Sequence, residues 1–399
     1  MKKFFSKLSR NDFLLVFFVF LLWRILLFVV SYLSVFLVPN YGHWFPYVER
    51  VLEITKLPPW LWGWGGFDGV HYLRIAQNGY DFIPSQAFFP LYPFLVRILN
   101  FLPKDMALDT SVYVDPSFFI VALLVSNVFA LLAFYAFYLL VKNIFNSKTA
   151  LLSLILLLSW PTGFYFGAIY TESLFLFLAS LSVYFSFKKK FLFAGIFAAF
   201  ASLTKVVGVC LFLLILIEFY LNYKGKIKLS KQFLKDFLGV LISPLGLVFY
   251  MFYLWKFFGK PFYFVEAQPL FAAERSDKPI ILLPQVVYRY FKIFIHTPIF
   301  SYQFNIALFE LSLTLLFFSL LFLFIRKMRF SYFIFTFLVL IIPTLTGTLT
   351  SMPRYTLTAF LIFPFLSEKY PRLVKLIIPF LIILQFILLT YFIRGYWVA

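Results

Sequence analysis

The sequence predicts an all-α integral membrane protein with about 11 spans, and two observations predict it. Of the 399 residues, 63% are hydrophobic and only 13% are charged, whereas about a quarter of the residues in a soluble domain are charged. Apolar runs also recur along the whole chain, and several reach the roughly 20 residues that a membrane helix needs. Lipid is therefore the expected surrounding of most of this chain.

The apolar runs place the expected spans in order along the chain. They lie near residues 13–38, 117–141, 149–166, 169–187, 191–203, 206–221, 236–257, 306–325, 330–350, 355–367 and 373–393. The first run follows a basic tail, as in a signal peptide, but it is too long and has no small-residue cleavage site, so we expect a retained span. We expect residues 1–399 to form a single polytopic membrane domain with two long polar loops, 39–116 and 258–305.

Basic residues sort to one set of connections between these spans. They gather in the N-terminal tail, at Lys142 and Lys148, and in the tracts 188–190, 224–235, 326–329 and 369–375. Placing these tracts on one side of the membrane puts 20 of the 35 Lys and Arg residues there, with only four of the 16 acids beside them. The positive-inside rule makes them cytoplasmic and both long loops external. No continuous basic face appears, so the net charge of +19 does not indicate a nucleic-acid partner.

Residues 191–221 lie between two of the basic tracts, so they must cross the membrane an even number of times. At a rise of about 1.5 Å per residue, the segment is too short for two full helical spans. We expect a hairpin of short helices that turns at Thr204-Lys205, with Lys205 at its external tip above a cavity. One long helix with a weaker charge asymmetry is the alternative.

The first external loop contains a short helix with polar residues on one face. A glycine pair precedes Asp68, which is typical of a helix start, and Asn78-Gly79 is typical of a helix end. Asp68, His71 and Tyr72 then share one face. The spacing alone fits two interpretations equally well. In one, these residues form a functional site; in the other, Asp68 only caps the helix and His71 makes a structural hydrogen bond.

Aromatic residues crowd the same loop. Trp60, Trp62 and Trp64 suit the headgroup level of a membrane, so we expect anchors there rather than a sugar-binding platform. Arg24 lies deep in the first apolar run, where a charged side chain needs a partner. An acid of the first loop is the expected partner.

Four segments resemble the signature of the phosphatidylinositol-glycan class V mannosyltransferases and their prokaryotic relatives. Two adjoin in the first loop, FDGVHYLRIAQNGY at 67–80 and AFFPLYP at 87–93. The other two lie at 161–175 and 201–208. Phe67 stands where the family usually has Trp, and Lys205 stands where it has Arg, which keeps the charge but loses the bidentate geometry.

The resemblance implies a multispanning helical bundle of the glycosyltransferase C-fold superfamily. It implies transfer of mannose, with inversion, from a polyprenyl- or dolichyl-phosphate donor on the non-cytoplasmic face. It also implies that Asp68 of the first loop is catalytic. The expected partners are this donor, a lipid-linked or surface glycan acceptor and the membrane lipids.

The residues suit that chemistry. An inverting transfer needs a carboxylate to accept the proton of the attacking hydroxyl, which fits Asp68. A phosphate leaving group needs a cation more than an acid, which fits Lys205 and Arg354, both at expected external turns. His71 and Tyr72 are further candidates for binding the donor phosphate or orienting Asp68. Arg354 fits contact with lipid headgroups equally well.

Glu172 and Asp81 are expected to be either structural or acceptor-facing. One cysteine and three widely separated histidines give no basis for a metal site, and no cofactor motif appears. A transporter or flippase of lipid-linked saccharides and a non-catalytic assembly subunit are the alternative functions. Since no additional domain is evident, we expect a prokaryotic plasma membrane rather than the endoplasmic reticulum.

Overall fold

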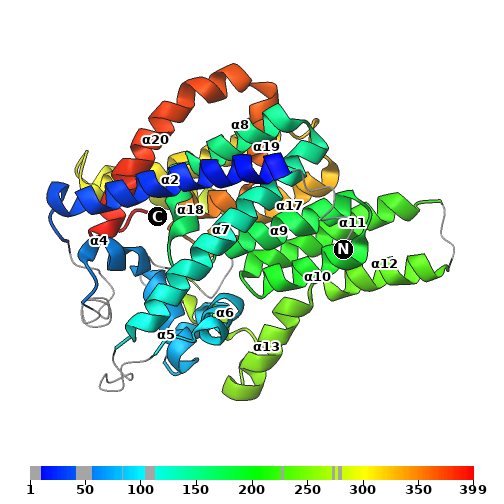
Figure 1. Cartoon of the computed structure of the whole chain (residues 1–399), viewed down its shortest axis with the longest axis horizontal. Helices are drawn as coiled ribbons and strands as arrows, with labels where there is room; N and C mark the ends of the chain where they lie inside the picture. The colour runs from blue at the N-terminus through cyan, green and yellow to red at the C-terminus, as the bar shows by residue number, and fades with distance from the viewer. Residues whose placement is uncertain are drawn as a thin grey trace.

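The computed structural model describes residues 10–41, 56–82, 84–103, 113–225, 229–271, 275–276 and 281–399. The basic tail at 1–9 and parts of both long loops lie outside these residues. Within the described ranges every regular element is a helix and no strand occurs. Helix α2 (Arg10–Leu37) crosses one face of the bundle and packs against α7 (Pro116–Ile144) and α20 (Pro371–Ile393) (Figure 1). The predicted all-α fold is confirmed.

Within the part of the chain that the structure describes, five helical stretches are long and apolar enough to cross a membrane, and a bent pair gives a sixth if it forms one span. The five are α2 (Arg10–Leu37), α7 (Pro116–Ile144), η5 with α11 (Val206–Cys210 and Leu211–Tyr223), α16 (Tyr302–Leu323) and α20 (Pro371–Ile393). The pair is α12 (Lys231–Ile242) and α13 (Leu245–Phe258), bent by 44°. Shorter apolar helices are α8 (Ser147–Leu158), α9 (Glu172–Phe187), α10 (Phe191–Ser202) and α17 (Phe330–Thr344).

The predicted number of 11 spans is not confirmed, because apolar runs do not reveal where a helix breaks. The run at 355–367 is the clearest case. It is divided among α18 (Met352–Tyr355), η7 (Thr356–Ala359) and α19 (Ile362–Lys369), and all three lie in the interior. The remaining elements are α4 (Pro59–Trp62), η2 (Gly63–Gly65), α5 (Asp68–Asn78), η3 (Ser85–Ala87), α6 (Leu91–Leu99), η4 (Gly163–Gly167), α14 (Tyr263–Glu266), η6 (Gln268–Leu270) and α15 (Leu283–His296).

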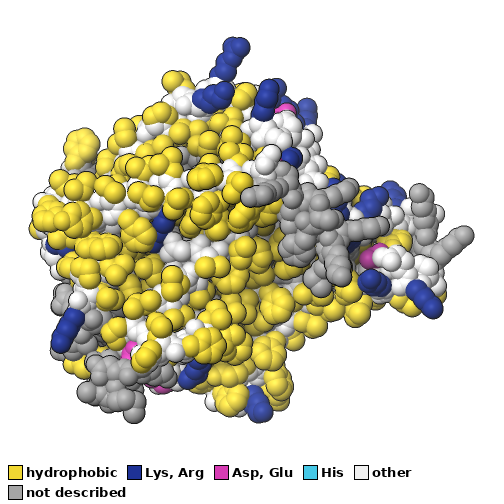
Figure 2. Space-filling view, viewed as in Figure 1, with side chains coloured by type: hydrophobic (Ala, Val, Ile, Leu, Met, Phe, Trp, Pro, Cys, Tyr) yellow, Lys and Arg dark blue, Asp and Glu magenta, His cyan; other side chains and the backbone are white. Residues whose placement is uncertain are grey.

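The outer surface is apolar to an extent that water would not tolerate. Figure 2 shows apolar side chains across the centre of one face, with Lys and Arg toward its edges. On α2, Phe18 and Leu22 are each 62% exposed. Apolar patches of this size are unfavourable on a soluble monomer, so lipid must cover them. The chain is an integral membrane protein.

The ion pairs agree with the side of the membrane predicted for each charge. Asp12 pairs with Lys142 at 2.6 Å, and both belong to the predicted cytoplasmic set. Arg329 of that set pairs with Glu218, also at 2.6 Å. The other ion pairs among the described residues join groups assigned to the opposite side. No pair joins the two sets within this part of the chain, as the predicted topology requires.

The predicted hairpin is present. Helix α10 ends at Ser202, the chain turns through 203–205, and η5 and α11 run back against α10. Lys205 lies at the turn with an extended backbone conformation. The second arm, 206–223, is longer than expected and reaches spanning length on its own.

The prediction that an acid of the first loop pairs with Arg24 is wrong. The guanidinium is buried, and its Nη2 donates to the carbonyl oxygen of Gly167 at 3.0 Å. Its Cζ lies 4.0 Å from the ring centroid of Phe28 and 4.1 Å from that of Trp64. A carbonyl oxygen and two aromatic rings therefore stabilise this cation, in place of the carboxylate that the sequence led us to expect.

Replacing Gly167 by Ala is expected to destabilise the protein by about 1–3 kcal/mol, because overpacking forces neighbours to move. A Cβ at this position would lie 2.4 Å from Nη1 of Arg24. Thermal unfolding in detergent measures the effect. The Arg24→Met variant provides the control: the costs of the two changes should not add in the double variant, since the clash disappears with the guanidinium. Additive costs would contradict this explanation.

Candidate active site

Helix α5 starts in a strained conformation that fixes Asp68 at its first position. Phe67, the preceding residue, has φ 56°, which is unfavourable for a bulky side chain. Its ring is held by Phe392 and Trp397, with centroids 5.7 and 5.2 Å away. At the other end, Gly79 closes the helix with φ 86°. The predicted helix is confirmed, and the packing of Phe67 maintains the strain at its start.

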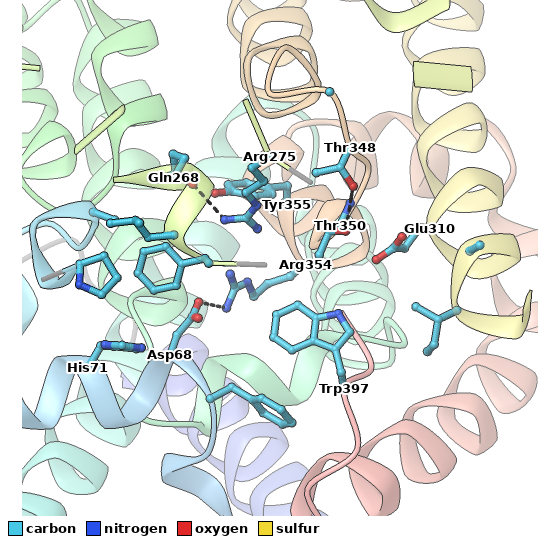
Figure 3. A pocket seen from close by; sticks show the side chains of 18 of the residues that line it. Asp68, His71, Gln268, Arg275, Glu310, Thr348, Thr350, Arg354, Tyr355 and Trp397 are labelled. Carbon is cyan, nitrogen blue, oxygen red and sulfur yellow. Dashed lines mark hydrogen bonds and ion pairs between the residues drawn. The ribbon is translucent and has the colours of Figure 1, made fainter. Parts of the chain in front are cut away.

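Four charged side chains from distant segments meet in a buried network. Arg354 of α18 donates from Nη1 to Oδ2 of Asp68 at 2.6 Å (Figure 3). Its Nε lies 3.6 Å from Oε1 of Glu172, at the start of α9. The same Oε1 accepts a 2.6 Å hydrogen bond from Nζ of Lys205. Asp68, Lys205 and Arg354, which the sequence places on the same side of the membrane, are thus brought together with Glu172.

The network determines the charge state of Asp68. Burial alone would raise the pKa of its carboxyl, but the charge and hydrogen bond of Arg354 hold the pKa below its ordinary value. Burial opposes the charge on Arg354 in turn, and the carboxylates of Asp68 and Glu172 outweigh it, so the pKa of Arg354 is raised. Asp68 is therefore ionised and Arg354 is protonated at neutral pH. Arg354 is only 7% exposed, which does not suit a headgroup-binding residue.

His71 and Tyr72 line the same cavity as Asp68. The imidazole of His71 stacks on Phe88 with a centroid distance of 4.6 Å. Burial, only partly opposed by the charge of Asp68, lowers the pKa of His71 to about 4. His71 is therefore neutral at pH 7 and supplies no positive charge for a phosphate. Burial also raises the pKa of Tyr72, so its phenol stays protonated.

The network opens on a cavity of 1410 Å³. Its lining includes polar residues that the sequence did not single out, namely Gln268, Arg275, Arg289, Tyr290, Glu310, Thr348 and Thr350. Arg275 donates from Nη1 to Oε1 of Gln268 at 2.9 Å. Loop 258–305 therefore supplies one wall of the cavity, which agrees with its predicted position on the same side of the membrane as the first loop. Of these seven residues, only Glu310 stands out in the sequence, because it is an acid inside a long apolar run.

Other expected site residues lie elsewhere. Asp81 does not line the cavity; its carboxylate lies 3.9 Å from Arg74. Trp62 and Trp64 are buried in the interior, so the prediction that they anchor the chain in the membrane surface is wrong. Trp64 instead forms part of the cage around Arg24. Among the described residues, no group of three or more His, Cys, Asp or Glu side chains is arranged to hold a metal ion.

The chain belongs to the PIG-V mannosyltransferase family, because the family profile described as Mannosyltransferase (PIG-V) matches residues 5–267, more than half of the chain. It is also similar to GPI mannosyltransferase 2 of Schizosaccharomyces pombe (strain 972 / ATCC 24843), with 31% identity over 167 residues. The match covers 41% of this chain and 34% of that relative, so it spans about a third of the relative's length. The all-helical fold agrees with the helical bundle that the resemblance implies.

Two solved structures of the Archaeoglobus fulgidus oligosaccharyltransferase are also similar to the chain. The apo form gives a TM-score of 0.44 at 11% identity and covers 95% of this chain and 56% of that one. The complex with Zn and sulfate gives a TM-score of 0.40 at 13% identity, with coverage of 93% and 53%. This chain therefore spans little more than half the length of that protein.

Proposed function

We propose that the chain is a membrane mannosyltransferase that uses a polyprenyl- or dolichyl-phosphate-linked sugar. It transfers the sugar, with inversion, to a hydroxyl of a lipid-linked or surface glycan on the non-cytoplasmic face. One observation carries the proposal: an ionised, largely buried Asp68 pairs with Arg354, and Glu172 links Arg354 to a second cation, Lys205, at a large cavity. Family membership supports the type of transfer, and the charge asymmetry of the loops supports the face.

In the proposed reaction the acceptor hydroxyl oxygen attacks C1 of the sugar from the side opposite the phosphate. The hydroxyl proton passes to the carboxylate of Asp68 as the new C1–O bond forms. The bond between C1 and the phosphate oxygen breaks, and the polyprenyl phosphate leaves with the electron pair. Arg354 and Lys205 stabilise the charge that develops on this leaving oxygen. His71, which is neutral, and Tyr72 contribute hydrogen bonds in this site.

The balance of charge suggests how the donor enters. Two carboxylates and two cations neutralise one another before a substrate arrives. Glu172 is 1% exposed and is fixed in the interior, whereas the side chain of Lys205 is 12% exposed and lines the cavity. We infer that Lys205 turns from Glu172 toward the incoming phosphate, while Arg354 keeps Asp68 in position. Glu172 is then a positioning residue for both cations.

The donor assay tests the function directly. Purified protein is given polyprenyl-phosphate-mannose, polyprenyl-phosphate-glucose or GDP-mannose, each with membrane lipid extract. We expect transfer from polyprenyl-phosphate-mannose alone. Transfer from GDP-mannose would contradict the proposed donor. Movement of a lipid-linked saccharide across vesicles without transfer would indicate a flippase, and donor binding without turnover would indicate an assembly subunit.

Lys205→Ala is expected to raise the KM for the donor and to lower kcat, by about 10- to 100-fold in kcat/KM, because a cation that faces the leaving phosphate is lost. Lys205→Arg, which introduces the usual residue of the family, should retain activity. Lys260→Ala is the matched control, since Lys260 forms an exposed ion pair with Glu266 and does not line the cavity. Unchanged kinetics in Lys205→Ala would exclude Lys205 from the donor site.

A further inference from the structure

The cavity continues well beyond the Asp68–Arg354 network. Its volume of 1410 Å³ exceeds the range of roughly 300–1,000 Å³ that holds a single drug-sized ligand. In Figure 3, Asp68 and Glu310 lie on opposite sides of Arg354, with Trp397 between them. The end of the cavity near Glu310 takes no part in the proposed donor chemistry. A transferase needs room for a second substrate, so the groups at this end require an explanation.

One face of α16 forms the wall at this end. Tyr302, Gln303, Ile306, Ala307 and Glu310 line the cavity at the three- and four-residue spacing of a single helix face. Glu310 is the last of them and reaches farthest along the helix. It is also the only acid in this spanning helix, where an ionisable side chain is costly unless it has a function.

Glu310 is held in place and still has hydrogen-bonding capacity. Glu310 as a whole is 4% exposed, and its Oε2 accepts a 2.5 Å hydrogen bond from the hydroxyl of Tyr290. The backbone N–H of Ser351 also faces this carboxyl. Its Oε1 is buried and has no hydrogen bond of standard geometry within the described residues. A carboxylate oxygen without such a partner can still accept hydrogen bonds from a ligand, and Glu310 is one of the residues that line the cavity.

The groups around Glu310 can bind hydroxyls. Thr348 and Thr350 line the cavity, and their hydroxyls are 2.8 Å apart. Trp397 adds an aromatic surface, and its backbone carbonyl accepts from the hydroxyl of Tyr302. Arg289, which also lines the wall, is engaged by the carbonyl of Gly347 at 3.0 Å. A carboxyl group, two hydroxyls and an indole together provide the hydrogen-bonding groups and the aromatic surface that suit a sugar ring.

We propose that Glu310, with Thr348 and Trp397, forms the acceptor subsite and binds hydroxyls of the hexose that receives the new sugar. This inference rests on the proposed function, since an acceptor subsite requires a transferase. The Glu310 carboxylate accepts hydrogen bonds from two ring hydroxyls, and the indole contacts the apolar face of the ring. The acceptor then extends past Arg354 toward Asp68, where its reacting hydroxyl is deprotonated.

A purely structural role is the competing explanation. The hydroxyl of Tyr290 also accepts a 3.1 Å hydrogen bond from the backbone N–H of Leu349. Glu310 could thus serve only to hold Tyr290 and the loop at 347–351. Glu310→Gln separates the two roles, because the amide oxygen still accepts from Tyr290 while the negative charge is lost. Tyr290→Phe breaks the connection to the loop but leaves the carboxylate in the cavity.

The test measures binding of octyl α-D-mannopyranoside by saturation-transfer-difference NMR in the Asp68→Asn background, where no turnover is needed. We expect Glu310→Gln to weaken binding about 10-fold or more, since hydrogen bonds to a charged group are lost. Glu218→Gln is the matched control: Glu218 is also buried in an apolar helix, but it pairs with Arg329 and does not line the cavity. The Glu218→Gln variant should bind the probe with unchanged affinity.

Kinetics with the same mannoside as acceptor provide the second measurement. Glu310→Gln should raise the KM for the acceptor and leave the KM for polyprenyl-phosphate-mannose unchanged. A raised donor KM alone, equal probe affinity in Glu310→Gln and its parent, or an equal loss in Tyr290→Phe would each overturn the subsite. Absence of probe binding by the parent would also overturn it. Normal probe binding by a protein that transfers no sugar would instead contradict the proposed function.

Discussion

Asp68→Asn is expected to lower sugar transfer by about 10²–10⁴-fold, the contribution of a positioned general base. The amide keeps the size of the carboxyl, and its oxygen can still accept the hydrogen bond from Nη1 of Arg354, which is now 2.6 Å from Oδ2. Folding should therefore be maintained, and so should donor binding, because Lys205 and Arg354 remain. Initial rates with polyprenyl-phosphate-mannose and thermal unfolding in detergent measure the two effects separately.

Asp81→Asn is the matched control for this experiment. Asp81 is an acid of the same loop, but it faces Arg74 at 3.9 Å and does not line the cavity. Its replacement should leave the rate unchanged. If Asp68→Asn turned over at a rate close to that of the native protein, Asp68 would not be the base.

The charged part of the site was predictable because its residues carry local signals. Asp68 follows a glycine pair at a helix start, and the basic tracts place Lys205 and Arg354 at turns on one side. A charged residue beside an apolar segment is easily noticed in a sequence with so few charged residues. The sequence, however, placed these residues only on the same side of the membrane and did not show which of them are in contact. The pairing of Arg354 with Asp68, 286 positions apart in sequence, is a result of the fold.

The parts that could not be predicted depend on contacts rather than on composition. Trp62 and Trp64 are of the residue type that anchors proteins at membrane interfaces, but both are buried, and Arg24 of another helix packs on the ring of Trp64. The cavity lining around Glu310, which we propose as the acceptor subsite, combines α15, α16 and the chain after α17, so no single segment indicates it. The breaks between α18, η7 and α19 lie in a run that is apolar throughout, and periodicity alone does not reveal them.

Arg354→Gln is expected to change both the rate and its dependence on pH. Loss of a cation at the leaving oxygen should lower kcat by about 10²–10³-fold. Arg354 is also what keeps the pKa of Asp68 below its ordinary value, against the effect of burial. The native carboxylate is ionised above that depressed pKa, and activity is lost as the pH falls through it. Without Arg354, burial raises the pKa of Asp68, so the acidic limb of the pH–rate profile should move to higher pH.

The same variant should be less stable at neutral pH, because a buried carboxylate is left with a weaker counterion. Removing one partner of a buried ion pair typically costs about 3–5 kcal/mol. Asp68→Asn should therefore restore part of the stability when it is combined with Arg354→Gln, since the uncompensated charge disappears. Arg97→Gln is the control, because Arg97 is exposed on α6 and donates only to the carbonyl of Gln77. An acidic limb at the native position in Arg354→Gln, or additive losses of stability in the double variant, would show that Arg354 does not control the ionisation of Asp68.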